Sequence, residues 1–573
     1  MNRTTTAKIG FFTLFAMFVG SVIGIGIFLK NGSVFKSSEF NPTSILLAWI
    51  ISTLICLVTA LSYAEIGLSS FSRLGLGRWS EKYGGKGLGY FVKFNLPIFY
   101  YGLLLPGISY YSAEMLLLNF TAVNGGILKD GLGQYSTVSL VVFLGTALYL
   151  IFLILNYISL KLSGHFQKFS LVVKFIPLIA VVIFGVVFGA ISPKSSLFFI
   201  ENNPSANPNI AIKPFNFNAV IIGLPGILFA FDSFLNFGPL VPSMENPRKK
   251  LPILITVSIV TIGAVYILIT IAQILVHEGI SWNVFNPTLL QEAFGVSKST
   301  AESISGGITQ AFFALILISV LGVLNGFAAS SIKLFAGTVA EQKIVGTTWL
   351  LEKARGNEDL AGLYLQLIIS IFWSLVYIAV IYGFNSDVYI DGLTNAPTLF
   401  FFLIYGLLPL LSAVEKIKLR VKKDRRFWIH ITFCIISFLG CWLIVFYQTF
   451  YVFIISALKN SNQTVQQALG WGGFADLTPT SPANYESVAY VFIGLGVVFL
   501  FLPLLNKLIM AIVKWHSDRG DSDEAIFKVE AHKEFKTNYP KRSFSNPNIS
   551  KQIRQNLNYG LSSFEEFIHN KRK

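Results

Sequence analysis

The sequence has little of what soluble proteins use freely, charged residues above all. Only 13% of the 573 residues are charged, whereas soluble domains average about 25%. The three cysteines, Cys56, Cys434 and Cys441, all lie within apolar runs, so neither a disulfide framework nor a zinc cluster is indicated. Hydrophobic residues make up 53% of the chain and the mean hydropathy is +0.63, values typical of a membrane protein.

The motifs of enzymes and nucleotide-driven pumps are also missing. The sequence contains no nucleophile with a nearby base, no metal-ligand spacing and no glycine-rich loop followed by Lys-Ser or Lys-Thr. We therefore expect a protein that is not an enzyme, uses no cofactor and is not driven by ATP.

The excess of basic residues has a simple distribution. Lys and Arg number 44 against 29 Asp and Glu, a balance that nucleic-acid-binding proteins also show. Most of these bases, however, fall in alternate short gaps between long apolar runs, such as residues 248–250 and 416–426. This is how a membrane protein marks its cytoplasmic side. We predict no nucleic-acid partner, a place in the plasma membrane and both termini in the cytoplasm.

About twelve apolar segments are long enough to cross a bilayer, which takes about 20 residues. The first is interpreted as a membrane helix rather than a removed signal peptide, because no cleavage signature follows it. The even number agrees with two cytoplasmic termini. The segments are 9–29, 43–70, 90–119, 137–158, 165–191, 217–241, 251–276, 306–330, 363–384, 394–413, 427–456 and 488–513.

The composition changes after Trp515. Residues 516–573 are polar and show no sustained period, so we predict a membrane domain over 1–515 and a cytosolic tail, partly or wholly disordered, over 516–573. A solvated tail is favoured over one that contacts anionic lipid. Heavy use of Phe, Ile, Asn and Lys fits an AT-rich bacterial genome.

The first segment contains GSVIGIGIF at 20–28, three glycines that each cost a helix interior about 1 kcal/mol. In lipid every backbone polar group needs a partner, so a broken helix is tolerated only beside a cavity or within protein. Transporters use such breaks to hold substrate. Close helix packing also selects glycine, and the first segment alone leaves both explanations open.

A second interruption is predicted in the sixth segment. GLPGILFAFDSFLNFGPLVP, residues 223–242, has Pro225 early, Asp232 in the middle and Gly238-Pro239 late. Breaks five segments apart suggest two inverted five-helix repeats with substrate bound between them.

Several motifs in order resemble the amino acid–polyamine–organocation permeases, and most closely their L-type exchanger branch. The resemblance covers roughly residues 10–515. It implies an all-α integral membrane fold with a LeuT-like five-plus-five core and broken helices one and six. The motifs are Gly20–Phe28, Tyr63-Ala64-Glu65, Leu160–Gly164 with Gln167 and Lys174, FAFDSFLNFGPLVPSMENPRKKLP over 229–252, and Gly322–Gly326 with Ser330-Ser331.

The chain departs from the family pattern at three places. Pro242 and Ser243 stand where a Glu-Glu pair is frequent, Lys333 replaces an arginine, and Phe234 replaces a tryptophan. We expect some contacts of the inner gate to differ accordingly.

The resemblance places an amino acid at the two breaks. Free N–H groups near Gly24–Gly26 would hold its carboxylate, and carbonyls of Val22 and of Phe229–Asp232 its ammonium. Phe231 or Phe229 would stack over it. The predicted substrate-binding residues are Ser21, Val22, Ile23, Gly24, Ile25, Gly26, Phe229, Ala230, Phe231 and Asp232.

Lys174 lies within an apolar run, where a charge is expensive and usually functional. By resemblance it occupies the cation site of sodium-coupled relatives, bonds first-helix carbonyls and reaches Ser330 or Ser331. A fixed positive charge there predicts sodium-independent transport, and loss of its proton in one conformation would allow proton coupling. A structurally paired lysine is the alternative.

Asp232 has two interpretations: it faces the cavity and pairs with the cationic end of arginine, lysine or ornithine, or it pairs with a protein cation or caps the broken helix. Glu65 is expected at an inner gate or helix end, and Glu114 has no assigned role.

These features predict a secondary amino-acid transporter, either an exchanger or a proton symporter. A sodium-coupled symporter and a non-transporting nutrient sensor that signals through the tail are the alternatives. Residues 120–136 contain no cysteine, so no disulfide-linked ancillary subunit is expected.

Overall fold

The computed structural model describes residues 10–123, 134–204, 211–235, 238–384, 388–419, 425–455, 459 and 485–538. The chain divides into two compact units, Met1–Leu505 and Asn506–Lys573. The described residues form helices and connecting turns, without a β-strand, and this confirms the predicted all-α class.

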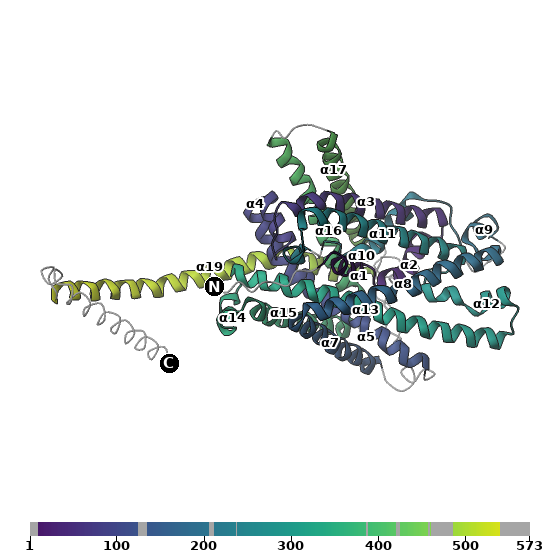
Figure 1. Cartoon of the computed structure of the whole chain (residues 1–573), viewed down its shortest axis with the longest axis horizontal. Helices are drawn as coiled ribbons and strands as arrows, with labels where there is room; N and C mark the ends of the chain where they lie inside the picture. Colours follow the sequence, from purple (N-terminus) through teal and green to yellow (C-terminus); the bar gives the residue numbers. More distant parts are fainter. Residues whose placement is uncertain are drawn as a thin grey trace. The chain divides into compact units, whose positions relative to one another are not determined.

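Ten helices of the described residues are long and apolar enough to cross a membrane, and Figure 1 shows the bundle they form. One of them is continuous through three segments, α4, η1 and α5, and another joins α17 to η6. The long helices are α3 (Pro42–Leu68), α4 (Leu76–Asn95), η1 (Leu96–Tyr101), α5 (Gly102–Val123), α7 (Gln134–Ile158), α8 (Leu160–Ile191), α11 (Pro247–Leu275), α13 (Lys298–Glu341), α15 (Glu358–Phe384), α16 (Val388–Lys418), α17 (Arg425–Phe446), η6 (Tyr447–Ile455) and α19 (Tyr485–Asn538).

Two further apolar segments are interrupted. The first is α1 (Phe11–Val22) followed by α2 (Ile25–Ser37), and the second is α10 (Phe217–Phe231) followed by the 3-10 turn η4 (Gly238–Ser243). Together with the ten long helices they make up the predicted twelve segments. Short helices connect the others: η2 (Pro193–Ser195), α9 (Leu197–Asn202), η5 (Ser281–Phe285), α12 (Pro287–Phe294) and α14 (Thr347–Lys353).

Local signals in the sequence set several helix ends. Asn41 caps α3, its side chain accepting from the Ser44 N–H at 2.9 Å, and Pro42 occupies the first helical position. Ser159 caps α8 in the same way and separates it from α7 by a single residue. Polar residues therefore start these helices even within apolar surroundings.

The first interrupted segment is longer than the predicted 9–29, because α2 continues to Ser37. Asn31 explains how a polar turn remains buried there. Its amide donates to Thr270 Oγ1 at 3.0 Å and to Gln273, and its carbonyl oxygen accepts from Trp49 Nε1 at 2.7 Å. Side chains of α3 and α11 thus satisfy a residue that hydropathy alone places outside the membrane.

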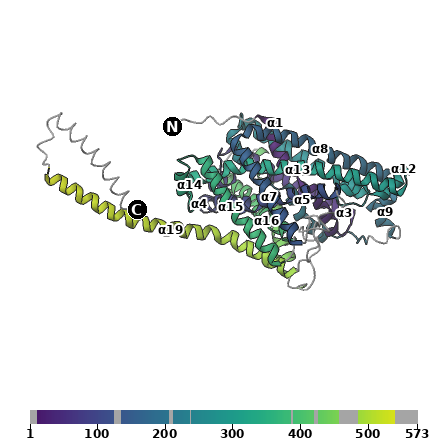
Figure 2. The same ribbon diagram turned by 90° about the horizontal axis from the view of Figure 1, so that it is seen from below.

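The interrupted helices pack against the long ones. α2 lies against α10, and α1 lies against α8 and α13. Figure 2 shows α8 and α13 side by side along much of their length. Large apolar side chains remain exposed on the outer faces, for example Ile183, Leu375 and Leu443, as expected of surfaces that meet lipid rather than water.

In the second unit the described residues, 506–538, belong to α19. This helix runs through the predicted boundary at 515/516. The predicted disorder of the tail stays a prediction, since residues 539–573 lie outside the described part of the chain.

Close packing of α15 on α13 gives a test of the fold. A Cβ at Gly362 would lie 2.5 Å from Ala336 N and 2.8 Å from Ala336 Cα, both backbone atoms. Gly362→Ala should therefore destabilise the protein by about 1–3 kcal/mol through overpacking. The apparent melting temperature in detergent, followed by size-exclusion chromatography, measures this loss.

Gly306→Ala provides the matched control, because Gly306 lies in α13 with open space around its Cβ position. Its melting temperature should be unchanged or slightly raised, since alanine favours a helix. Equal melting temperatures for the two variants would contradict the packing described for Gly362.

Candidate functional site

The break in the first segment exposes backbone carbonyls at the end of α1. The last carbonyls of a helix have no partner within it, and here Ile23 N–H satisfies only Val19 O. Lys174 of α8 is fully buried, and its ammonium donates hydrogen bonds to Gly20 O at 2.8 Å and Ile23 O at 2.5 Å. One cation from a neighbouring helix thus holds two carbonyls of the broken turn.

Two hydroxyls satisfy the remaining carbonyls of this turn. Ser233 Oγ donates to Ser21 O at 3.0 Å, from the residue that follows Asp232 in the second break. Tyr266 of α11 lies 3.3 Å from Val22 O and 3.0 Å from Ala230 O. Its hydroxyl carries one hydrogen, so it can donate fully to only one of the two. Both contacts join the first break to the second.

The N-terminal end of α2 faces the same space. Gly24 precedes this helix and provides no capping side chain, so the first-turn N–H groups of α2 form an anion-binding end. A Cβ at Gly24 would meet Val323 of α13 at 2.7 Å, and one at Gly26 would meet the Ala230 backbone at 3.0 Å.

The glycines of the first segment therefore serve both purposes that the sequence left open. Gly24 lies at the break itself. Gly20 lies within α1, where a Cβ would be 2.1 Å from Gln167 Nε2, so it is required by close packing. Gly26 combines a place on the cavity wall with close approach to α10.

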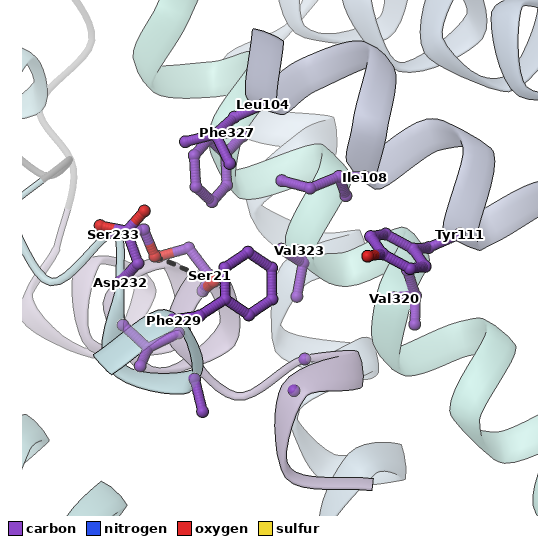
Figure 3. Close-up of a pocket in the computed structure, with 14 residues that line it drawn as sticks. Ser21, Leu104, Ile108, Tyr111, Phe229, Asp232, Ser233, Val320, Val323 and Phe327 are labelled. Carbon is purple, nitrogen blue, oxygen red and sulfur yellow. Dashed lines mark hydrogen bonds between the residues drawn. The ribbon is translucent and has the colours of Figure 1, made fainter. Parts of the chain in front are cut away.

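A cavity lies between the two breaks. Figure 3 shows Asp232, Ser233 and Ser21 at one end and Tyr111 with Val320 at the other, and the ring of Phe229 between them. One end is therefore polar and the other largely apolar. The lining residues are Ser21, Val22, Gly24, Gly26, Leu104, Ile108, Tyr111, Phe229, Ala230, Asp232, Ser233, Val320, Val323 and Phe327.

The structure brings most of the predicted binding residues to this cavity. Ser21, Val22, Gly24, Gly26, Phe229, Ala230 and Asp232 line it. Ile23 contributes only its carbonyl, which Lys174 already holds. The side chain of Ile25 lies outside the described part of the structure.

Phe229 and Phe231 differ in their position relative to the cavity. Phe229 borders the cavity, whereas Phe231 is fully buried behind it and packs edge-on against Tyr266 at 5.1 Å between ring centroids. Residues two apart lie on different faces of a helix, so only Phe229 is placed to cover a substrate.

Asp232 ends α10 and borders the cavity with 6% of its surface exposed. Tyr100 O–H lies 2.9 Å from both carboxylate oxygens, Thr398 Oγ1 donates to Oδ2 at 2.6 Å, and the Ser233 N–H donates as well. Neither interpretation from the sequence describes this arrangement fully. The carboxylate reaches the cavity and is also held by the protein, but by hydroxyls rather than by a cation.

A local change of helix type places Tyr100. Residues 96–101 form a π-helical turn between α4 and α5, with Pro97 at its start. Such turns insert one residue into the helix and often occur at functional sites. This insertion accompanies a buried Tyr100 that lies directly on Asp232.

Ser330 and Ser331 do not join Lys174. Among the described residues, Ser331 Oγ instead donates to Ala328 O at 2.9 Å and accepts from Gln366 at 2.7 Å. The reason is the distance along α13: the residue of that helix beside the ammonium is Gly322. Ser330 lies eight residues beyond it, about 12 Å along the helix axis.

Sequence reasoning missed Tyr100, Thr398 and Tyr266, which have no local signal because each lies in an apolar helix of another segment. It also missed the apolar lining of the cavity. Leu104, Ile108 and Tyr111 follow the helical spacing of three to four residues along α5, as do Val320, Val323 and Phe327 along α13, but this spacing is equally typical of ordinary core packing.

The two other acidic residues considered from the sequence lie outside the cavity lining. Glu65, near the end of α3, forms an ion pair with Lys416 and contacts His430 Nδ1 at 3.0 Å. This agrees with a helix-end position. Glu114 is buried in α5, and the structure does not suggest a role for it.

Among the described residues, ten helices long and apolar enough to cross a membrane surround two interrupted apolar segments that share a cavity, an arrangement typical of a multi-pass membrane protein of the permease class. The profile of the family described as amino acid permease matches residues 13–505. The chain belongs to this family, as its motifs had indicated.

Curated relatives are distant and extend beyond the matched part. The serine/threonine exchanger SteT of Bacillus subtilis is 26% identical over 320 residues, 56% of this chain and 65% of the relative. The glutamate/serine transporter AimA of the same organism is 23% identical over 47% of each chain. The mouse b(0,+)-type amino acid transporter 1 is 22% identical over 58% of this chain and 64% of the relative. The chain thus spans about half to two thirds of their lengths.

The fold is shared with a solved structure, MhsT in complex with L-phenylalanine. The TM-score is 0.52 at 14% sequence identity, over 76% of this chain and 97% of that one. This likeness confirms the predicted LeuT-like fold and says nothing by itself about substrate.

Lys174→Met tests the role of the ammonium. The variant keeps an unbranched side chain but leaves Gly20 O and Ile23 O without their donor. An unsatisfied buried group costs about 1–3 kcal/mol, so the apparent melting temperature in detergent should fall clearly. Lys168→Met is the control, since Lys168 is exposed on the same helix and should melt as the wild type does. A Lys174→Met protein as stable as this control would contradict the proposed role of the ammonium at the break.

Proposed function

We propose that the protein is a secondary transporter that moves amino acids across the plasma membrane by alternating access, independently of sodium, and that cationic amino acids are among its substrates. The observation that carries this proposal is the meeting of two interrupted helices at one cavity, where the carbonyl end of α1 lies beside the N–H end of α2.

The backbone would recognise the part common to all amino acids. The uncapped first turn of α2 offers N–H groups to the carboxylate. Val22 O and Ala230 O, which share the single hydrogen of Tyr266, retain lone pairs for the ammonium. Because main-chain atoms form this grip, it discriminates little between side chains.

The side chain would be read at the ends of the cavity. Asp232 has no cationic partner among the described residues, so its carboxylate suits the charged end of arginine, lysine or ornithine. The apolar end, with Ile108 and Val320, suits neutral side chains. The relatives named as a serine/threonine exchanger and a glutamate/serine transporter support serine as a neutral substrate.

Sodium independence rests on Lys174. Its ammonium already supplies a positive charge to the carbonyls of the broken turn, and a second cation there would be repelled at close range. Exchange of one amino acid for another is supported by the relative named an exchanger, and proton coupling is the other sodium-independent mode.

Two alternatives make different predictions. A sodium-coupled symporter would lose uptake without sodium. A nutrient sensor would bind amino acids without moving them and would signal through residues 516–573.

We further propose that both termini are cytoplasmic, that the source is bacterial and that no disulfide-linked subunit accompanies the chain, whose three cysteines are all buried.

Uptake of labelled arginine into proteoliposomes, with and without internal arginine, tests the proposed function. Wild-type protein should take up arginine, and Asp232→Asn should raise the half-saturating arginine concentration at least about tenfold, since a hydrogen bond to a charged group contributes about 1.5–3 kcal/mol. Labelled serine should still be carried by the variant.

Glu302→Gln is the matched control, because Glu302 is exposed near the start of α13; it should leave arginine uptake unchanged. Arginine uptake that is equal in Asp232→Asn and wild type would remove Asp232 from side-chain recognition. Binding of serine and arginine without flux of either would favour the sensor.

Replacement of external sodium by choline is a separate test. Uptake of serine and arginine should be the same in both salts, because Lys174 occupies the position of a coupling cation. A loss of uptake in choline, restored by sodium, would show that the symporter alternative is correct.

A further inference from the structure

Asp232 differs from three paired acidic residues of the protein in what neutralises it. Glu81 and Glu341 both contact Lys93 Nζ, at 2.6 and 2.7 Å, and Glu65 pairs with Lys416. Asp232 is more deeply buried than these three glutamates. Within the described residues it forms no ion pair, only hydrogen bonds.

In the described part of the chain, the ionisable groups found to interact electrostatically with Asp232 are neutral side chains that could only become anionic. They are Tyr100 and Tyr101 of η1, Tyr405 of α16 and Cys56 of α3. The cavity walls from α5 and α13 add only apolar side chains and Tyr111. Lys174 is directed instead to Gly20 and Ile23.

An ionised carboxylate without a counter-charge is too costly in such surroundings, and such a group normally takes up a proton. The hydroxyl partners of Asp232 suit both its ionised and its protonated form, because a hydroxyl can donate or accept a hydrogen bond. Tyr100 and Thr398 donate to the carboxylate, and each can accept from the carboxylic acid after a small rotation. A lysine or arginine partner, which only donates, would have fixed the charged form.

We propose that a proton and the cationic group of a substrate alternate at Asp232, so that the protein exchanges protons for cationic amino acids without net movement of charge. This inference rests on the proposed function. As the cationic side chain enters, the Asp232 carboxyl releases its proton to water in the cavity. When the side chain leaves on the other face, the carboxylate takes a proton from the water there.

The site predicts which substrates are coupled. Lys174 lies at the backbone end of the site, so a proton carried there would accompany every amino acid. A proton carried by Asp232 would be displaced only by a cationic side chain. Transport of serine should therefore not respond to a pH gradient that drives uptake of arginine.

Proteoliposomes without internal amino acid, with the dye pyranine inside and the interior more acidic than the exterior, provide the test. Wild-type protein should take up labelled arginine faster than in vesicles without the gradient, and the interior should become alkaline by about one proton per arginine. A potassium potential set with valinomycin should not change the rate, because the exchange carries no net charge. Serine–serine exchange should respond to neither gradient.

The pH dependence separates this role from a purely structural one. Protons and arginine compete for Asp232, so the half-saturating arginine concentration should rise by up to about tenfold for each unit of falling pH. Thr398→Val removes one donor to the ionised carboxylate and should shift this dependence to higher pH. Ser437→Ala, which removes a buried hydroxyl that contacts Thr59 outside the cavity lining, should leave the pH dependence unchanged.

Each other result would overturn the inference in a distinct way. Arginine entry that follows the membrane potential without alkalinisation, or that requires internal arginine, would leave the proposed function standing and exclude proton antiport. Alkalinisation with serine as well would assign the proton to a group that serves all substrates. Serine transport without any arginine transport would remove both the cationic specificity and this inference.

Discussion

The unpaired carbonyls at the end of α1 are the constraint on which the site depends. A helix that stops within a membrane leaves polar groups that lipid cannot satisfy. Here a lysine, a serine and a tyrosine from three other segments supply the donors: Lys174, Ser233 and Tyr266. α8, α11 and the second break are thereby fixed around the first. The cavity is the space that this arrangement leaves between them.

The two ends of the cavity follow from different physics. Main-chain groups of the two breaks line part of the wall, where polarity is set by helix direction and cannot be altered by substitution. Asp232 forms one end, and its charge must be balanced from outside the protein, because its hydroxyl partners Tyr100 and Thr398 bring no positive charge. The ammonium of Lys174 is directed to the carbonyls of Gly20 and Ile23 instead. Under the proposed function, recognition of the substrate backbone and balance of charge would be carried out by separate groups.

Particular residues show how far the sequence could be interpreted. The glycines and prolines of the two breaks are local signals, because a helix interrupted in an apolar run leaves few physical explanations. Lys174 could be found for the same reason, since a charge there needs a partner. The predicted contact of Ser330 or Ser331 with Lys174 was wrong. A motif shows which residues are neighbours along the chain, but it does not show which turn of α13 faces the ammonium. Phe229 and Phe231 could be distinguished only by the direction in which α10 faces.

By itself the sequence determined that the chain spans a membrane about twelve times, that the first and sixth segments are interrupted and that it belongs with amino acid permeases, because hydropathy, helix-breaking residues and ordered motifs are local properties. Only the tertiary structure decided what surrounds the breaks. The hydroxyls on Asp232, the apolar end of the cavity and the hydrogen of Tyr266 shared by two carbonyls come from segments far apart in sequence. Which of their faces meet is settled by packing across the whole bundle, and no local pattern encodes it.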